Sequence, residues 1–174
     1  MRKYSTVEAA LEAVRQDGLA LRDVPEEMKT EAVCLAAVQQ YGQALAFVPK
    51  ELKTPEVCLE AVKQDGRALK FVPPALKTEE LCIEAVRQAG QAFRFVPERL
   101  KTPAVCFEAA RRRGLSLLDV PVSLRSEEVC TAAVRQHQDA MMYVPMRLRD
   151  ALATKAEAGA EPEAGAEELD VPRP

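Results

Sequence analysis

The 174-residue chain contains no apolar run that approaches the roughly 18 residues of a membrane-spanning helix. Its first six residues, Met-Arg-Lys-Tyr-Ser-Thr, lack the apolar segment of a signal peptide. Histidine occurs once, as His137, and no cysteine has a second cysteine or a histidine within a few residues, as a zinc site requires. These absences argue against a membrane protein and a metal site, and we expect the protein in the cytoplasm.

Catalytic patterns are absent as well. We recognise no nucleophile paired with a base and no glycine-rich phosphate loop. The position of His137 holds Asp, Tyr, Ala or Arg in the equivalent places along the chain, which is typical of a solvated residue. We therefore predict that the chain is not an enzyme and has no catalytic residues, no cofactor and no metal.

Charge is nearly balanced along most of the chain and becomes acidic at its end. Residues 1–150 carry 22 Lys and Arg against 21 Asp and Glu, whereas residues 151–174 carry 2 against 6, for a net charge of −3. The last part is rich in Glu, Ala and Gly, a composition that cannot build a packed core. We predict a capping helix over residues 151–158 and an acidic disordered tail over residues 159–174.

The chain does contain a strict repeat of 24 residues. Val-Pro pairs, glycines and cysteines each recur at this interval, which indicates tandem structural units that stack on their neighbours. The predicted domain comprises residues 1–150. Its six units are residues 6–29, 30–53, 54–77, 78–101, 102–125 and 126–149.

Each unit opens with a helical phrase. In the third unit, Thr54 stands where an N-cap hydroxyl is favoured and Pro55 occupies the first helical position. Val57 and Ala61 belong to an apolar stripe of helical period. Gly66 follows at the C′ position, where a left-handed conformation is common. The pattern predicts a first helix of about 11 residues.

The second phrase of each unit ends at Val-Pro, so it forms a short second helix or a 3₁₀ turn. Helices this short are unstable alone, and a single unit cannot bury its apolar face. Stability must therefore come from stacking. The predicted fold is all-α, a right-handed α-solenoid of six 24-residue repeats.

The stretch that begins Val57-Cys-Leu-Glu-Ala-Val-Lys-Gln-Asp-Gly-Arg-Ala-Leu resembles a bacterial family of tandem modules known as a domain of unknown function, number four-one-one-six. The resemblance extends over all six units. The short unit is also similar to the leucine-rich variant repeat, in which a helix alternates with a 3₁₀ segment. The first resemblance implies no catalytic residues and an interaction scaffold.

The five cysteines occupy one position of the apolar helical pattern. Equivalent residues on stacked helices lie about 8–10 Å apart, beyond the ~7 Å limit for a disulfide. We interpret them as reduced, buried thiols, with a thiol-based metal or redox store as the alternative. A column of glutamines near each helix end is expected to bond the free carbonyl groups of its own or the next unit.

Basic residues also form columns, near the end of the first helix, within the second segment and at the close of each unit. Such residues complement helix C-termini, so we interpret them as a solvated face. The alternative is nucleic-acid binding through these Lys and Arg columns. The unit-closing column is Lys29, Lys53, Lys77, Lys101, Arg125 and Arg149.

One column alternates between aromatic and acidic residues, so it is not deep core, and exposed aromatic patches often bind partners. We predict a scaffold for protein–protein interaction, with a partner and an oligomeric state that the sequence does not identify. Packing is the alternative role of this column. Three methionines, Met141, Met142 and Met146, either lie under the tail helix or form a docking surface. The predicted partner-binding residues are Phe47, Phe71, Phe95, Arg67, Lys70 and Arg94.

Overall fold

The computed structural model describes residues 4–158, in which every regular element is a helix and no β-strand occurs. Each unit contributes one α-helix of ten residues, one fewer than predicted. The predicted all-α repeat solenoid is confirmed, whereas its handedness stays a prediction. The six helices are α1 (Val7–Gln16), α2 (Glu31–Gln40), α3 (Pro55–Gln64), α4 (Glu79–Gln88), α5 (Pro103–Arg112) and α6 (Glu127–Gln136).

Two 3₁₀ helices complete each of the first five units, on either side of the Val-Pro pair. The longer ones have six residues: η1 (Gly18–Asp23), η3 (Gly42–Phe47), η5 (Gly66–Phe71), η7 (Gly90–Phe95), η9 (Gly114–Asp119) and, in the sixth unit, η11 (Gln138–Tyr143). The shorter ones have three residues: η2 (Glu26–Met28), η4 (Lys50–Leu52), η6 (Pro74–Leu76), η8 (Glu98–Leu100) and η10 (Val122–Leu124).

Side-chain caps explain where these helices begin. The hydroxyl of Thr54 accepts the N–H of Val57 at 3.3 Å at the start of α3, as the sequence predicted. The Asp65 carboxylate then accepts the N–H of Arg67 at 2.9 Å and caps η5. The residue between each α-helix and the following 3₁₀ helix is therefore a second cap site in the units that carry Asp there.

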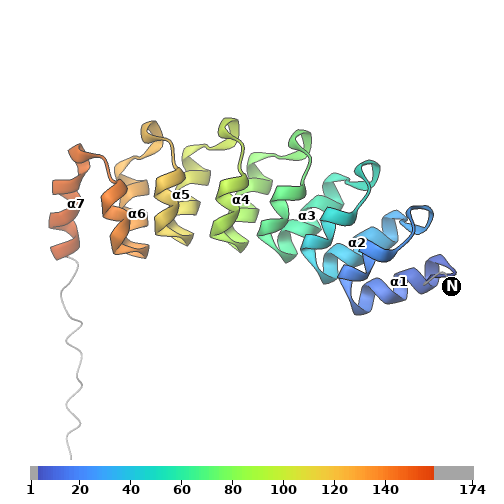
Figure 1. The fold of residues 1–174 in the computed structure, drawn as a ribbon. Coiled ribbons are helices and arrows are strands. Elements are labelled where there is room, and N and C mark those ends of the chain that lie inside the picture. Colours follow the sequence, from blue (N-terminus) through green and yellow to red (C-terminus); the bar gives the residue numbers. More distant parts are fainter. Residues whose placement is uncertain (1–3, 159–174) are drawn as a thin grey trace, which may run out of the picture.

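The helices form two layers along a curved array (Figure 1). Consecutive α-helices contact one another in one layer, and consecutive six-residue 3₁₀ helices contact one another in the second. Between the layers lies one continuous core. In the third unit Val57, Cys58, Ala61 and Val62 are buried, together with Leu69 from η5.

The five cysteines are unpaired and fully buried in this core, in agreement with the prediction of reduced thiols. Burial raises the pKa of the Cys58 thiol to about 11, because the thiolate loses its hydration. A protonated, inaccessible thiol reacts slowly and ligates metals poorly. The column therefore acts as a small apolar side chain that fills the space between the layers.

The regular 24-residue spacing of glycine in the first five units has a different physical cause from the one that the sequence analysis predicted. No glycine in the described part of the chain has a positive φ, and α3 ends instead at the extended residue Asp65. A Cβ at Gly66 would collide with the backbone carbonyl oxygen of Ala85 in the next α-helix. At Gly18 the equivalent oxygen, that of Ala37, would lie 2.5 Å from the added carbon. Glycine is required because the next unit packs directly on the backbone.

The sixth unit closes the array with a seventh α-helix, α7 (Met146–Ala158), in place of the short 3₁₀ turn. The helix expected over residues 151–158 thus begins five residues earlier. Leu152 is buried, Leu148 packs against the core, and α7 contacts α6. The predicted tail over residues 159–174 lies outside the described residues. None of the described helices is long and apolar enough to cross a membrane.

The glycine contact gives a direct test. Gly66→Ala is expected to destabilise the protein by about 1–3 kcal/mol, because the added methyl group must displace the α4 backbone. Chemical denaturation followed by circular dichroism measures the change. Gln138→Ala is the matched control, since residue 138 holds the glycine position in the unit that no regular unit follows. An equal loss in both variants would contradict the close-approach explanation.

Candidate functional site

The predicted aromatic strip lies in the 3₁₀ layer. Phe47, Phe71 and Phe95 are each partly buried and pack against the core. The Lys70 ammonium lies 4.5 Å from the centre of the Phe71 ring, and the Arg94 guanidinium carbon lies 5.7 Å from the centre of the Phe95 ring. These distances are typical of cation–π contacts. Four of the six predicted site residues thus form two neighbouring cation–aromatic pairs.

Arg67 is held by different contacts. Its guanidinium makes a bidentate pair with the Asp65 carboxylate, with nitrogen–oxygen distances of 2.9 and 3.0 Å. Burial alone would raise the pKa of Asp65, but hydrogen bonds from Arg67 and Gln43 outweigh it and lower this pKa. Arg67 lines a polar cavity with Tyr41 and Asp65. It therefore belongs to a cap structure, and the partner-binding role of the six residues stays a prediction.

The unit-closing basic column does not form a solvated face. The Lys77 ammonium donates to the carbonyl oxygen of Phe95 at 2.9 Å, in the 3₁₀ helix of the next unit. Burial lowers the pKa of Lys77 and of Lys53, which shows that both ammonium groups have lost hydration. The same inter-unit bond joins Lys53 to Phe71 (3.2 Å), Lys101 to Asp119 (3.0 Å) and Arg125 to Tyr143 (2.8 Å).

The glutamine column also links units, at two of its positions. The side-chain oxygen of Gln64 accepts the N–H of Gly42 at 2.6 Å, and its amide nitrogen donates to the carbonyl of Gln40 at 3.4 Å. Gln136 accepts the N–H of Gly114 in the same way. The predicted structural role is thus present, although the bonded groups belong to the preceding unit and include a donor as well as a carbonyl.

The α-layer carries an apolar column that the sequence reasoning missed. The sixth residue of each unit is apolar in five units and lies beside the buried Val-Cys-Ala-Val stripe. Leu59 is 37% exposed, and the other members are partly buried. The sequence does contain a signal for this column, because an apolar residue recurs at the same place in five units, outside the core stripe. The column consists of Leu11, Leu35, Leu59, Ile83 and Phe107, with Thr131 in the sixth unit.

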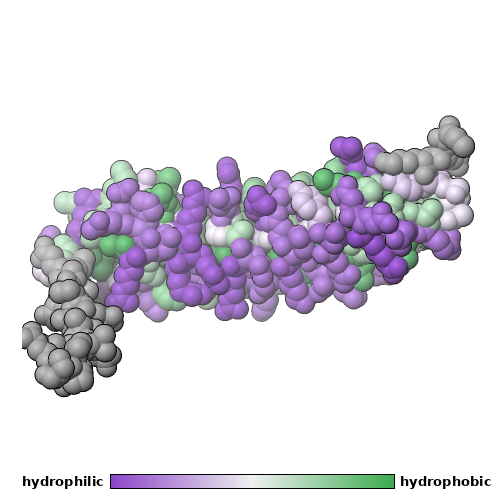
Figure 2. Space-filling model, turned by 90° about the horizontal axis from the view of Figure 1, so that it is seen from below, coloured by the Kyte–Doolittle hydropathy of each residue, from purple (hydrophilic) through white to green (hydrophobic). Residues whose placement is uncertain are grey.

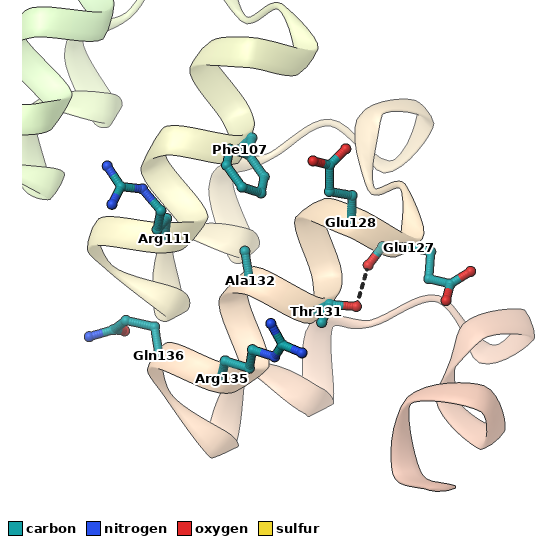
Figure 3. Close-up of a pocket in the computed structure, with 8 residues that line it drawn as sticks. All are labelled: Phe107, Arg111, Glu127, Glu128, Thr131, Ala132, Arg135 and Gln136. Atoms are coloured by element: carbon teal, nitrogen blue, oxygen red, sulfur yellow. Dashed lines mark hydrogen bonds between the residues drawn. The ribbon is translucent and has the colours of Figure 1, made fainter. Parts of the chain in front are cut away.

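Open grooves lie between neighbouring α-helices along this column. The groove between α5 and α6 has a volume of about 760 Å³, and the one between α3 and α4 about 560 Å³. Figure 3 shows Phe107 and Ala132 between α5 and α6, with Glu128 near one end of the groove and Arg135 near the other. An apolar middle with acidic and basic ends is the common layout, because acidic side chains sit in the first helical turn and basic ones in the last.

The edge of the array that faces down in Figure 1 has a different character. Hydrophilic side chains cover it along the middle units, and apolar side chains show mainly toward the ends (Figure 2). His137 is exposed, with Nδ1 3.8 Å from the Asp139 carboxylate. Within residues 4–158 no three Cys, His, Asp or Glu side chains are grouped as a metal site would need.

A protein-family model described as Domain of unknown function (DUF4116) matches residues 7–53 and 54–101, more than half of the chain. The chain belongs to the DUF4116 family. No curated protein and no solved structure matches it. Each DUF4116 match spans two of the stacked 24-residue units of this chain. The match covers units one to four, whereas the resemblance was expected in all six.

Unit five, which lies outside the DUF4116 matches, contains a buried carboxylate. Glu108 is 6% exposed and accepts hydrogen bonds from Arg111 at 2.7 Å and Arg112 at 3.3 Å. Arg87 of unit four approaches it at 3.9 Å. Burial would raise the pKa of Glu108, but the two hydrogen bonds and the arginine charges outweigh burial and lower this pKa. Arg112 takes the place of the usual glutamine, so a charge cluster joins units four and five.

We predict that Lys77→Met destabilises the protein by about 1–2 kcal/mol, because the Phe95 carbonyl loses its buried donor. Lys63→Met is the matched control, since Lys63 is exposed and pairs only with Glu60 at 2.9 Å, a contact worth about 0.5 kcal/mol. Urea denaturation at neutral pH measures both changes. If both variants lost the same small amount of stability, the unit-closing column would be a solvated face after all.

Glu108→Gln is expected to cost about 1–2 kcal/mol at pH 7, because three arginines lose their shared carboxylate. The folded pKa lies below the ordinary value of 4.5. The stabilisation by Glu108 is therefore complete above pH 4.5 and is lost as the pH falls through the folded pKa. Denaturation of both proteins between pH 7 and 3 should show the difference shrinking in acid. Glu60→Gln is the control, and a difference independent of pH would refute the assignment.

Proposed function

We propose that this DUF4116 protein is a non-enzymatic scaffold that binds another protein through the α-layer. The partly exposed apolar column is the observation that supports this function. The core already buries the Val-Cys-Ala-Val stripe, and the further apolar residue on the outer side of five of the six helices keeps part of its surface exposed. Rows of partly exposed apolar side chains commonly mark surfaces that bind proteins. A solenoid presents such a row as one extended surface.

The groove chemistry indicates the kind of partner. An amphipathic helix places its apolar side chains between two supporting helices, as in other helix-in-groove complexes. Glu80 and Glu84 at the α3–α4 groove favour basic side chains of the partner, whereas Lys63 and Arg87 favour acidic ones. The proposed partner segment is thus an amphipathic helix with opposite charges at its two ends.

Nucleic-acid binding remains the alternative function. The unit-closing basic column is the most regular feature that could support it, but most of this column bonds the next unit instead. Lys53, Lys77 and Lys101 donate to backbone carbonyls of the next unit, so they cannot also neutralise phosphates without losing those bonds. Arg111 and Arg112 are partly neutralised by Glu108. Phosphate contacts would then fall to the remaining exposed Lys and Arg of a repeat body with almost no net charge.

The experiment is affinity capture from cells that contain the protein, followed by titration of each captured protein against purified variants. The double variant Leu59→Gln and Ile83→Gln removes the apolar anchors of the α3–α4 groove. We expect binding to weaken about 30-fold or more, since each anchor contributes at least about 1 kcal/mol. Circular dichroism checks that the variant keeps its helices.

Two comparisons distinguish the α-layer groove from the aromatic strip and from nucleic-acid binding. The control variant Phe71→Ala and Phe95→Ala changes the 3₁₀ layer and should bind as tightly as the wild type. Loss of binding in this control alone would move the site to the predicted aromatic strip. Captured material that disappears after nuclease treatment or at high salt would support the nucleic-acid alternative instead.

A further inference from the structure

The 3₁₀ layer has an open position at the C-terminal end of the array. Each six-residue 3₁₀ helix contacts the corresponding helix of the next unit up to η11. Beyond η11 the described residues supply only α7, which contacts α6 in the other layer. Met141 of η11 is only partly buried, whereas its equivalents in the other five units, such as Leu117, are fully buried. The described residues leave unfilled the position next to η11 where a seventh 3₁₀ segment would lie.

Arg149 shows what that position can bind. In unit five, Arg125 donates from Nε to Val120 O at 3.0 Å and from a terminal nitrogen to Leu118 O at 3.2 Å. Its second terminal nitrogen donates to the carbonyl of Tyr143 in the next unit.

Arg149 repeats the first two bonds, to Val144 O at 2.9 Å and Met142 O at 3.0 Å. Within residues 4–158 its remaining terminal nitrogen has no acceptor, because no next unit follows. The guanidinium is therefore fixed in the geometry that holds a neighbouring carbonyl.

A second copy of the chain does not fit this end in the regular way. Regular stacking requires glycine where the backbone meets the next α-helix, as at Gly114 with the carbonyl of Ala133. The sixth unit has Gln138 at this place, and its side chain would collide with an incoming α1. In addition, α7 already packs against α6. The occupant must therefore bring a 3₁₀-layer segment without an α-helix of its own.

The C-terminal segment contains such a sequence. Residues 169–172 read Leu-Asp-Val-Pro, identical to residues 118–121 of unit five. In unit five the carbonyl of Asp119 accepts the Lys101 ammonium at 3.0 Å, and Val120 is buried. The equivalent residues, Asp170 and Val171, carry the same carbonyl and the same apolar side chain.

The length of the chain permits this placement. Helix α7 has 13 residues and is about 20 Å long, and it runs from the loop edge toward the opposite edge of the array (Figure 1). Residues 159–168 span at most about 33–36 Å when extended. This reach is sufficient to return along α7 to the level of Arg149, which lies in its first turns.

We propose that residues 169–172 dock against η11 and close the 3₁₀ layer, with the free nitrogen of Arg149 donating to the carbonyl of Asp170. Val171 covers the apolar surface beside Met141. The chain thus caps its own array with a copy of the segment that each unit uses internally.

The test uses the full chain with a spin label on a cysteine introduced by Glu167→Cys, because the five native thiols are buried. Amide signals of η11 are expected to lose most of their intensity, and those of η1 none. Adding Val171→Asp should restore the η11 signals, since a charge cannot be buried there. Ala166→Asp, which adds the same charge outside residues 169–172, should leave the broadening unchanged.

Dilution and mixing identify the source of the broadening. If the docking is intramolecular, the broadening of the η11 signals persists on dilution. It is then absent when unlabelled ¹⁵N chains are mixed with spin-labelled ¹⁴N chains. Broadening in the mixture would assign the contact to a second copy and overturn the proposal. Signals of η11 that stay sharp, or that broaden equally with those of η1, would overturn it as well.

Discussion

The close approach of one unit's backbone to the α-helix of the next is the constraint on which the rest of the structure depends. At Gly66 no side-chain carbon fits beneath the carbonyl of Ala85. Because the contact joins two backbones, it fixes the spacing and rotation between units whatever side chains surround it. Such an approach buries peptide groups that need partners. Gln64 supplies one by accepting the N–H of Gly42, so the glycine and glutamine columns are two parts of one interface.

In the 3₁₀ layer, longer side chains supply hydrogen-bond partners for peptide groups at the junction between units. A six-residue 3₁₀ helix is weak by itself, and the Val-Pro pair ends it before its last carbonyl groups find partners within the helix. The carbonyl of Phe71 is one of these, and Lys53 of the preceding unit reaches it. Proline therefore creates an acceptor, and the basic residue 18 positions earlier in the sequence binds it. At four junctions between units, the Val-Pro pair and the unit-closing basic residue therefore depend on one another.

The sequence was sufficient for the features that local chemistry determines. Thr54, Pro55 and Pro73 mark helix starts and stops through their own backbones and hydroxyl groups, and the structure has these boundaries. Features that depend on the next unit were not accessible in this way. A glycine after a helix has the same sequence signature whether it serves a left-handed turn or a close contact. The sequence around Lys77 likewise does not indicate that its ammonium group donates to the carbonyl of Phe95.

The repeat also limits what sequence can say about the site. Positions that stacking requires are similar in all units, so similarity within the chain identifies the interface between units and not the proposed partner-binding surface. Leu59 was overlooked because an apolar residue next to the core stripe resembles more core. The structure separates the two, since Cys58 is fully buried and Leu59 is 37% exposed. The sixth residue of the unit also changes from Leu59 to Ile83 to Phe107 while the stripe beside it stays Val or Leu, then Cys. A position that stays apolar but varies in shape, on a backbone whose spacing is fixed, gives each groove a different apolar side chain, and such variation suits the extended protein-binding surface that we propose.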